Sequence, residues 1–129
     1  MKVNYKLALT MLAGTALGAA AIQALHAQAK PPVYVVIDIA DITDPEGFKA
    51  LGQRSNAAGA AVFKEQGGRY IARTQNITAL DGTAPKRLII IAFDSAEKAQ
   101  AWNNSPPQKD VNAIRGKTTK SRSFIVEGM

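Results

Sequence analysis

The sequence contains no cysteine and a single histidine, His26. His26 lies in an N-terminal segment that we expect to be removed, so the remaining domain would contain neither residue type. This excludes Ser-His-Asp and Cys-His nucleophile pairs, zinc sites built from Cys and His, disulfide bonds, and a histidine ligand to haem. We therefore expect no metal and no cofactor, and a general base would have to be a carboxylate or a lysine.

The start of the chain has the composition of a secretory signal. Lys2 and Lys6 precede an uncharged stretch over residues 7–24, which is followed by the small residues Ala27 and Ala29. This order is typical of a signal peptide that is cleaved after Ala27 or Ala29. The 18 uncharged residues are close to the lower limit of about 20 for a spanning helix, so an N-terminal membrane anchor is the alternative. We expect an exported bacterial protein, periplasmic or secreted.

Residues 1–29 are thus predicted to be a signal peptide, and residues 30–129 a single domain, because their number suits one domain. Loss of two lysines with the signal lowers the net charge from +6 to +4. The basic residues are spread along the chain and are densest between Arg115 and Arg122. Only Phe124 lies near them, whereas nucleic-acid binding requires a basic face with interleaved aromatic residues. We expect a solvated basic face, with no nucleic acid and no membrane as partner after cleavage.

The hydrophobic pattern of the domain predicts the element order β-α-β-β-α-β. Asp44-Pro45 favours a helix start, and Gly67-Gly68 favours its end. The expected strands are 33–40, 69–75, 86–93 and 121–127, with 77–80 as a candidate continuation of the second; the expected helices are 45–65 and 95–117, the latter interrupted at residue 105. This order is that of the ferredoxin-like fold, an α+β protomer with a four-stranded antiparallel sheet and helices on one face.

The predicted strands carry apolar residues on both faces. Val36 adjoins Ile37, and Ile90 adjoins Ile91. Helices can cover only one face of this sheet, and a large bare apolar face is improbable in a soluble monomer. We therefore predict a homodimer in which two sheets pack face to face around a two-fold axis.

Five short segments occur in a recognisable order: DPE at 44–46, GGRYIAR at 67–73, FDS at 93–95, AWNNSP at 101–106 and IVEG at 125–128. With these segments the sequence resembles the domain-of-unknown-function family numbered thirteen-thirty, of the dimeric α+β barrel superfamily. The resemblance spans about residues 33–128. It implies a ferredoxin-like protomer, a homodimer and a pocket between sheet and helices, but no particular activity. The sequence departs from the family pattern at Phe48 and Leu51, where tyrosine is usual, and at Pro107 and Gln108, where glutamate and tyrosine are usual.

Asp38 is a candidate site residue because it interrupts the most apolar strand. A desolvated carboxylate there would suit a general base. The alternatives are an ion pair with a neighbour such as Arg73, or an exposed strand end near Asp41.

Arg73 is the second candidate. Strict alternation along its strand places it on the face of Ile71 and opposite Tyr70. A guanidinium on a covered sheet face needs a partner. That partner is either a ligand carboxylate, bound by two parallel hydrogen bonds, or the carboxylate of Asp38 or Glu127; a dimer contact is the remaining alternative.

Trp102, the only tryptophan, either forms a pocket wall that stacks on an aromatic ligand or belongs to the core. Asn103 and Ser105 follow it at a helix break. They are either helix-end residues or hydrogen-bonding groups of a pocket.

We therefore expect an exported domain that binds a small organic molecule, anionic or aromatic, in a pocket near Asp38, Arg73 and Trp102. One alternative is a small-molecule enzyme of the dimeric α+β barrel type, a cofactor-independent oxygenase or isomerase. The other is a structural or interaction module. These three residues around an open cavity would favour the first two functions, and a filled cavity would favour the third.

Overall fold

The computed structural model describes residues 31–53 and 57–129. They belong to one compact unit, Pro31–Met129. The predicted signal peptide lies outside the described residues. The elements are β1 (Val33–Ile42), α2 (Pro45–Gln53), α3 (Ala57–Glu65), β2 (Arg69–Thr74), β3 (Arg87–Phe93), α4 (Ala96–Asn103), α5 (Pro106–Thr118) and β4 (Thr119–Glu127). No helix within the described ranges has the length and apolar character needed to cross a membrane.

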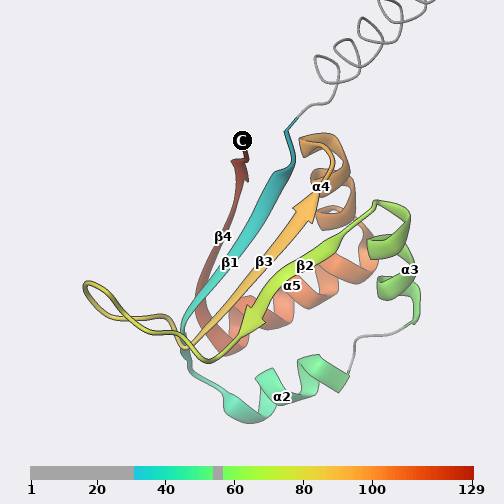
Figure 1. The fold of residues 1–129 in the computed structure, drawn as a ribbon. Coiled ribbons are helices and arrows are strands. Elements are labelled where there is room, and N and C mark those ends of the chain that lie inside the picture. The colour runs from blue at the N-terminus through green and yellow to red at the C-terminus, as the bar shows by residue number, and fades with distance from the viewer. Residues whose placement is uncertain (1–30, 54–56) are drawn as a thin grey trace, which may run out of the picture. The chain divides into compact units, whose positions relative to one another are not determined.

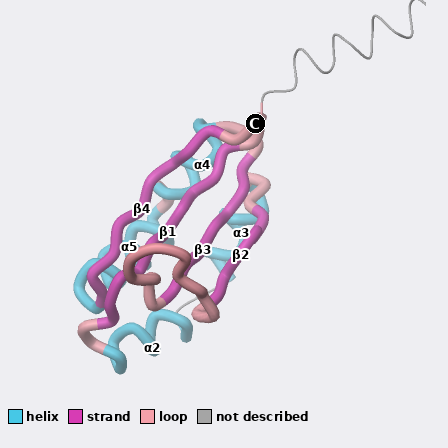
Figure 2. The backbone as a smooth tube through the Cα atoms, turned by 60° about the vertical axis from the view of Figure 1, so that its left-hand side comes forward, coloured by secondary structure: helices cyan, strands magenta, loops and turns pink. Residues whose placement is uncertain are grey.

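The four strands form one sheet in the order β2-β3-β1-β4, and every neighbouring pair is antiparallel. The helices cover one face of this sheet, whereas the other face is open (Figures 1 and 2). The predicted α+β, ferredoxin-like architecture is confirmed.

The core lies between the sheet and the helices. In β1, Val33, Val35, Ile37 and Ile39 are buried on the helix-facing side, and the intervening residues are half-buried on the open face. The predicted two-residue alternation is therefore present in β1. Ile91 and Phe93 extend the core into β3, and α4 adds Ala99 and Trp102.

The first helical region differs from its prediction. We expected one helix over residues 45–65, but the structure has α2 ending at Gln53 and α3 beginning at Ala57. The start agrees with the prediction, since the Gly47 amide donates to Asp44 Oδ1 at 3.1 Å. Gly52, a poor helix former, immediately precedes the end of α2.

The end of α3 also agrees with its prediction. Gly67 has φ of +74°, which glycine adopts without steric cost. The Gly68 amide donates to the Phe63 carbonyl at 2.9 Å, a bond that closes the helix end. A Cβ atom on Gly68 would lie 2.5 Å from the Phe63 ring, so the chain passes this ring closely.

The second helical region is divided at Ser105, as predicted. Ser95 caps α4, because its Oγ accepts from the Lys98 amide at 3.2 Å. Ser105 precedes α5 but makes no capping bond with its side chain. Its Oγ donates instead to the Trp102 carbonyl at 2.6 Å, which fixes the turn between the two helices.

A bulge in β2 changes the orientation of Arg73. The pairing with β3 shifts between Tyr70 and Ala72, so that Tyr70 lies opposite Ile91 and Arg73 lies opposite Ile89. Both partners face the helices, and therefore Tyr70 and Arg73 do as well. The prediction that they occupy opposite faces is wrong, because strict alternation fails across a bulge. The candidate continuation at 77–80 is also not a strand.

Candidate functional site: a cavity between sheet and helices

A cavity of about 600 Å³ lies between the helix-facing side of the sheet and the helices. Residues from β1, β2, β3 and all four described helices line it. The aliphatic part of the wall consists of Ile37, Ile39, Leu51, Ile89, Ile91 and Val111. The volume is within the range of about 300–1,000 Å³ that small-molecule sites occupy.

One end of the cavity, here called the aromatic end, is formed by Phe63, Tyr70 and Trp102. The rings of Phe63 and Tyr70 stack with centroids 4.8 Å apart, and Phe63 meets Trp102 edge-on at 6.2 Å. Trp102 is 5% exposed and also packs on Phe93 at 5.4 Å. Trp102 therefore belongs to the core and to the cavity wall at once, so both readings from the sequence hold in part.

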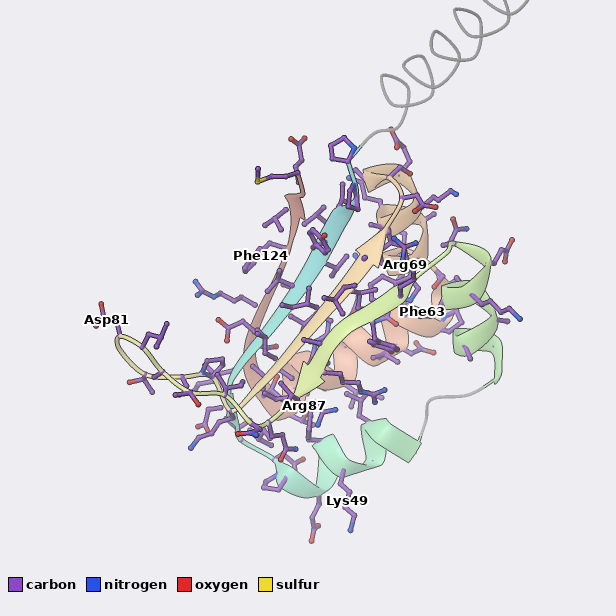
Figure 3. All side chains as sticks on the ribbon, in the orientation of Figure 1. Lys49, Phe63, Arg69, Asp81, Arg87 and Phe124 are labelled. Atoms are coloured by element: carbon purple, nitrogen blue, oxygen red, sulfur yellow. The ribbon has the colours of Figure 1, made fainter. Side chains whose placement is uncertain are left out.

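The cationic side chains of the wall are Lys49, Arg73, Arg87 and Arg115. We call this part of the wall the cationic end, and Phe48 lies within it beside Arg87. Arg73 pairs with Ile89, and Arg87 pairs with Ile39, so the two arginines follow each other along the sheet toward α2. Figure 3 shows Arg87 at the α2 end of the sheet and Phe63 beside α3. No acidic side chain is among the described residues that line the cavity, and the sequence between Lys49 and Lys64 contains none.

The two sheet arginines that line the cavity, Arg73 and Arg87, have aromatic neighbours and form none of the ion pairs found among the described residues. The Arg73 guanidinium lies 5.2 Å from the centroid of the Tyr70 ring, and that of Arg87 lies 6.0 Å from the Phe48 ring. These are cation–π distances. The ion pairs among the described residues involve Asp94 and Asp38, neither of which lines the cavity.

Arg115 is the most buried of the four cations, with 8% exposure. Its side chain donates to Asn112 Oδ1 at 2.7 Å, its one hydrogen-bond partner among the described residues. Burial lowers the pKa of the Arg115 guanidinium below its ordinary value. The charged form is therefore less stable in the folded domain than in water.

Asn112 connects Arg115 to the break between α4 and α5. Its Oδ1 also accepts from Gln108 Nε2 at 2.9 Å, and its Nδ2 donates to Asn103 Oδ1 at 2.8 Å. Asn103 itself does not line the cavity. Its connection to the site is indirect, through the asparagine that orients Arg115.

Of the five residues singled out in the sequence, Arg73 and Trp102 line the cavity, whereas Asp38, Asn103 and Ser105 do not. Asp38 lies on the open face, in phase with Tyr34 and Val36, and its Oδ2 accepts from Arg122 Nε at 3.2 Å. The expectation that Asp38 and Arg73 share a pocket is not met. Asp38 has the expected ion pair, but with a residue of β4.

Sequence reasoning missed Arg87 and Arg115 because it treated them as part of a solvated basic face. For Arg115 that expectation is wrong. Arg115 shares a helix face with Val111 and Thr118, at spacings of four and three residues, which is the pattern of a covered face. Arg87 alternates in phase with Ile89 and Ile91, which signals the same side of the sheet.

The described residues contain no group of three or more His, Cys, Asp or Glu side chains that could hold a metal ion. The lining residues can neutralise charge through guanidinium and ammonium groups, donate hydrogen bonds, stack on aromatic rings and make apolar contacts.

Several solved structures have a similar fold. A protein of unknown function from Rhodopseudomonas palustris is 15% identical, with a TM-score of 0.56 over 85% of this chain and 92% of that chain. A dimeric ferredoxin-like protein of unknown function from Thermobifida fusca is 10% identical, with a TM-score of 0.54 over 77% and 92%. SnoaB, a cofactor-independent oxygenase from Streptomyces nogalater, is 15% identical, with a TM-score of 0.51 over 77% and 94%. At these identities the likeness concerns the fold alone.

No curated protein matches the sequence. A family model does match, over residues 32–129, which is nearly all of the described unit. The chain therefore belongs to the family described as a domain of unknown function, DUF1330.

Proposed function

We propose that this domain binds a small organic molecule, anionic or aromatic, in the cavity between sheet and helices. The observation that carries the proposal is the cavity itself: it is open, mostly apolar, and supplied with a few convergent cationic groups. A purely structural module would fill this space with side chains, because protein interiors pack to the density of organic crystals. An open site of this volume and composition is the usual form of a ligand pocket.

The direct test is mass spectrometry of small molecules released from protein that was purified after expression of the full chain. A thermal-shift screen with a chemically diverse library accompanies it, since a ligand that binds only the folded state raises the melting temperature. We expect a co-purifying organic molecule, or library compounds that raise the melting temperature in a saturable way. If neither is found, the binding proposal is wrong.

Binding is better supported than catalysis. SnoaB has a similar fold and is a cofactor-independent oxygenase, but a common fold is a weak argument for a common reaction. Tyr70 and Lys49 are the described lining residues suited to proton transfer, since the wall has guanidinium groups but no carboxylate. The enzymatic alternative, an oxygenase or isomerase without cofactor, would have to use these two groups.

We also propose that two copies of the domain pack through their open sheet faces. Phe124 and Val126 of β4 are 42% and 38% exposed on this face. They continue an apolar surface of half-buried residues: Tyr34, Val36, Leu88 and Ile90. The similar protein from Thermobifida fusca is described as dimeric, which supports a dimer here.

Export is the third part of the proposal, and it rests on residues 1–29 of the sequence. N-terminal sequencing of the protein recovered from a bacterial host that exports it is the test. We expect a new N-terminus after Ala27 or Ala29, because these small residues follow the apolar stretch. Recovery of a chain that begins at Met1 in the membrane fraction would favour the N-terminal anchor instead.

A further inference from the structure

We infer that the ligand is an organic acid with a flat aromatic body, whose acid group lies at the cationic end of the cavity and whose rings lie at the aromatic end. This inference rests on the proposed function and names its ligand class. It follows from how the two ends are arranged along the sheet, and from charges that the described protein residues leave uncompensated.

The two ends are separated along the strands. On the helix-facing side, Tyr70 is level with Ile91, Arg73 is level with Ile89, and Arg87 is level with Ile39. A sheet residue and the next residue on the same face are about 7 Å apart, from a rise of about 3.3 Å per residue. The helix-facing side of the sheet therefore carries Tyr70, then Arg73, then Arg87 in successive steps, over a distance that a two-ring molecule with one acid group spans.

Arg115 belongs to the cationic end although it comes from a helix. The carbonyl of Thr118, one turn further along α5, accepts from the amides of Thr43 and Asp44 at 2.8 and 3.0 Å. This contact brings the end of α5 to the end of β1, where Ile39 pairs with Arg87. The backbone of Arg115 thus lies in the helix layer near the end of the cavity where Arg87 lies, and its guanidinium is directed back along α5 toward Asn112.

The buried charge of Arg115 calls for an anion, whereas Arg87 is half-buried and Lys49 and Arg73 are exposed to solvent. Four cations line the cavity, and no acidic side chain of the described residues lines it with them. A buried charge is costly unless it is paired, and Arg115 has only the neutral amide of Asn112 as a partner among these residues. Arginine binds carboxylates through two parallel hydrogen bonds. An acid group on the ligand would supply the partner that the described chain lacks.

The shape of the aromatic end favours a flat ligand. The rings of Phe63, Tyr70 and Trp102 line the cavity and are held at fixed angles to one another. Rings gain more from such neighbours than from area burial alone, by offset stacking or edge-to-face contact. A flexible aliphatic chain gains only the free energy of burying its apolar surface.

The test is calorimetric titration of the protein with three probes: 2-naphthoate, its neutral analogue 2-naphthalenemethanol, and octanoate. We expect 2-naphthoate to bind about 10- to 100-fold more tightly than the neutral analogue, because a hydrogen bond between two charged groups is stronger than one to a neutral hydroxyl. We expect octanoate to bind more weakly than 2-naphthoate. If 2-naphthalenemethanol binds as tightly as 2-naphthoate or more tightly, the inference that the ligand has an acid group is wrong. If octanoate binds more tightly than 2-naphthoate, the inference that the ligand has an aromatic body is wrong.

The Arg115→Met variant tests whether the acid group of the ligand binds at Arg115. We expect this substitution to lower the affinity for 2-naphthoate about 10-fold or more and to change the affinity for 2-naphthalenemethanol by less than about threefold. We also expect the ligand-free variant to melt a few degrees higher, since a buried charge without a carboxylate partner is replaced by an apolar side chain. Asn112 keeps its bonds to Gln108 and Asn103, so the substitution strands no buried group.

Lys117→Met is the matched control. It removes the same charge from the same helix, at an exposed position that does not line the cavity, and should leave the affinity for 2-naphthoate unchanged. A lower melting temperature of Arg115→Met together with retained affinity for 2-naphthoate would make Arg115 structural and overturn its assignment. If other library compounds bind but the acid has no advantage, the ligand class is wrong and the proposed function stands. If no compound binds at all, the proposed function itself fails.

Discussion

Arg73 carries a positive charge in a strand whose neighbours are mostly apolar, and no carboxylate of the described residues pairs with it. The sequence left three alternatives open for it: a ligand, a protein carboxylate or a dimer contact. Asp38, one of the candidates, is paired with Arg122 on the other face of the sheet. The contact that Arg73 makes instead is with the ring of Tyr70, which leaves its guanidinium free to bind an acid group.

We therefore predict that Arg73→Met melts within a few degrees of the wild type and loses most of its affinity for organic acids. Methionine replaces the stem of the side chain, and removal of the charge strands no protein carboxylate. Had Arg73 belonged to a buried ion pair, the cost would be about 3–5 kcal/mol. Thermal melts with and without 2-naphthoate measure both effects.

Arg69→Met is the control for this prediction. It removes a guanidinium from the same strand, but one that forms an exposed ion pair with Asp94 at 3.1 Å and does not line the cavity. Such a pair contributes about 0–1 kcal/mol, so stability should change little and acid binding should persist. A large fall in melting temperature for Arg73→Met, with binding retained, would show that Arg73 is structural.

At the scale of single residues, the sequence identified Arg73 and Trp102 but not Arg87 and Arg115. The difference has a physical reason. Trp102 and Arg73 are conspicuous where they stand, one as the only tryptophan and the other as a charge within an apolar strand. Arg115 stands among other basic residues, and its burial depends on how α5 packs on the sheet. The basic composition suggested a solvated face, whereas the helical spacing from Val111 to Thr118 indicates a covered face that includes Arg115.

Among the elements, the end of α3 positions the aromatic end of the cavity. Gly68 brings the chain past the Phe63 ring at a distance that leaves no room for a Cβ atom. We predict that Gly68→Ala lowers the free energy of unfolding by about 1–3 kcal/mol, because the ring must move from its place between Tyr70 and Trp102. Chemical denaturation measures this change.

Gly116→Ala is the matched comparison. It lies within α5, and a Cβ atom there would meet nothing within 4 Å. Alanine is the better helix former, so this variant should gain about 0.5–1 kcal/mol. Similar effects of the two substitutions would contradict the role assigned to the close approach between Gly68 and Phe63.

Some features of the helices and strands could be predicted from the sequence, and others could not. Capping residues and glycines act locally, and the helix start that they predict at Asp44 and the helix end that they predict at Gly67 are present. The bulge in β2 depends on how the strand pairs with β3. A register shift of this kind has no local signature here, and it decides the face on which Arg73 lies. The continuous helix over 45–65 fails for a related reason, since regular apolar spacing does not specify where one helix ends and another begins.

The molecule as a whole has one sheet face that its own helices leave open (Figure 2). Phe124 lies on the side of the sheet away from the helices (Figure 3). We predict that the wild type is a dimer at micromolar concentration and that Phe124→Asp is a monomer, because a carboxylate would be buried against a second apolar sheet. Light scattering gives both masses.

Ala113→Asp introduces the same charge at an exposed position of α5 and should leave the dimer intact. A monomeric wild type would contradict the predicted assembly, as would a Phe124→Asp variant that remains a dimer. Apolar patterning on both faces of the strands leads to this prediction from the sequence alone, because a half-covered sheet needs a second layer. The volume of the cavity could not be predicted from the sequence, because it depends on how closely the helices approach the sheet.

The central claim is that an organic acid enters the cavity, and Trp102 provides a direct probe of it. Trp102 is the only tryptophan of the chain and lines the aromatic end. Replacement of tryptophan by 5-fluorotryptophan during expression therefore gives a single fluorine resonance from the cavity wall. Titration with 2-naphthoate should shift this resonance in a saturable manner that follows the calorimetric binding curve. Saturable binding of 2-naphthoate with an unmoved Trp102 resonance would place the ligand elsewhere and contradict the account.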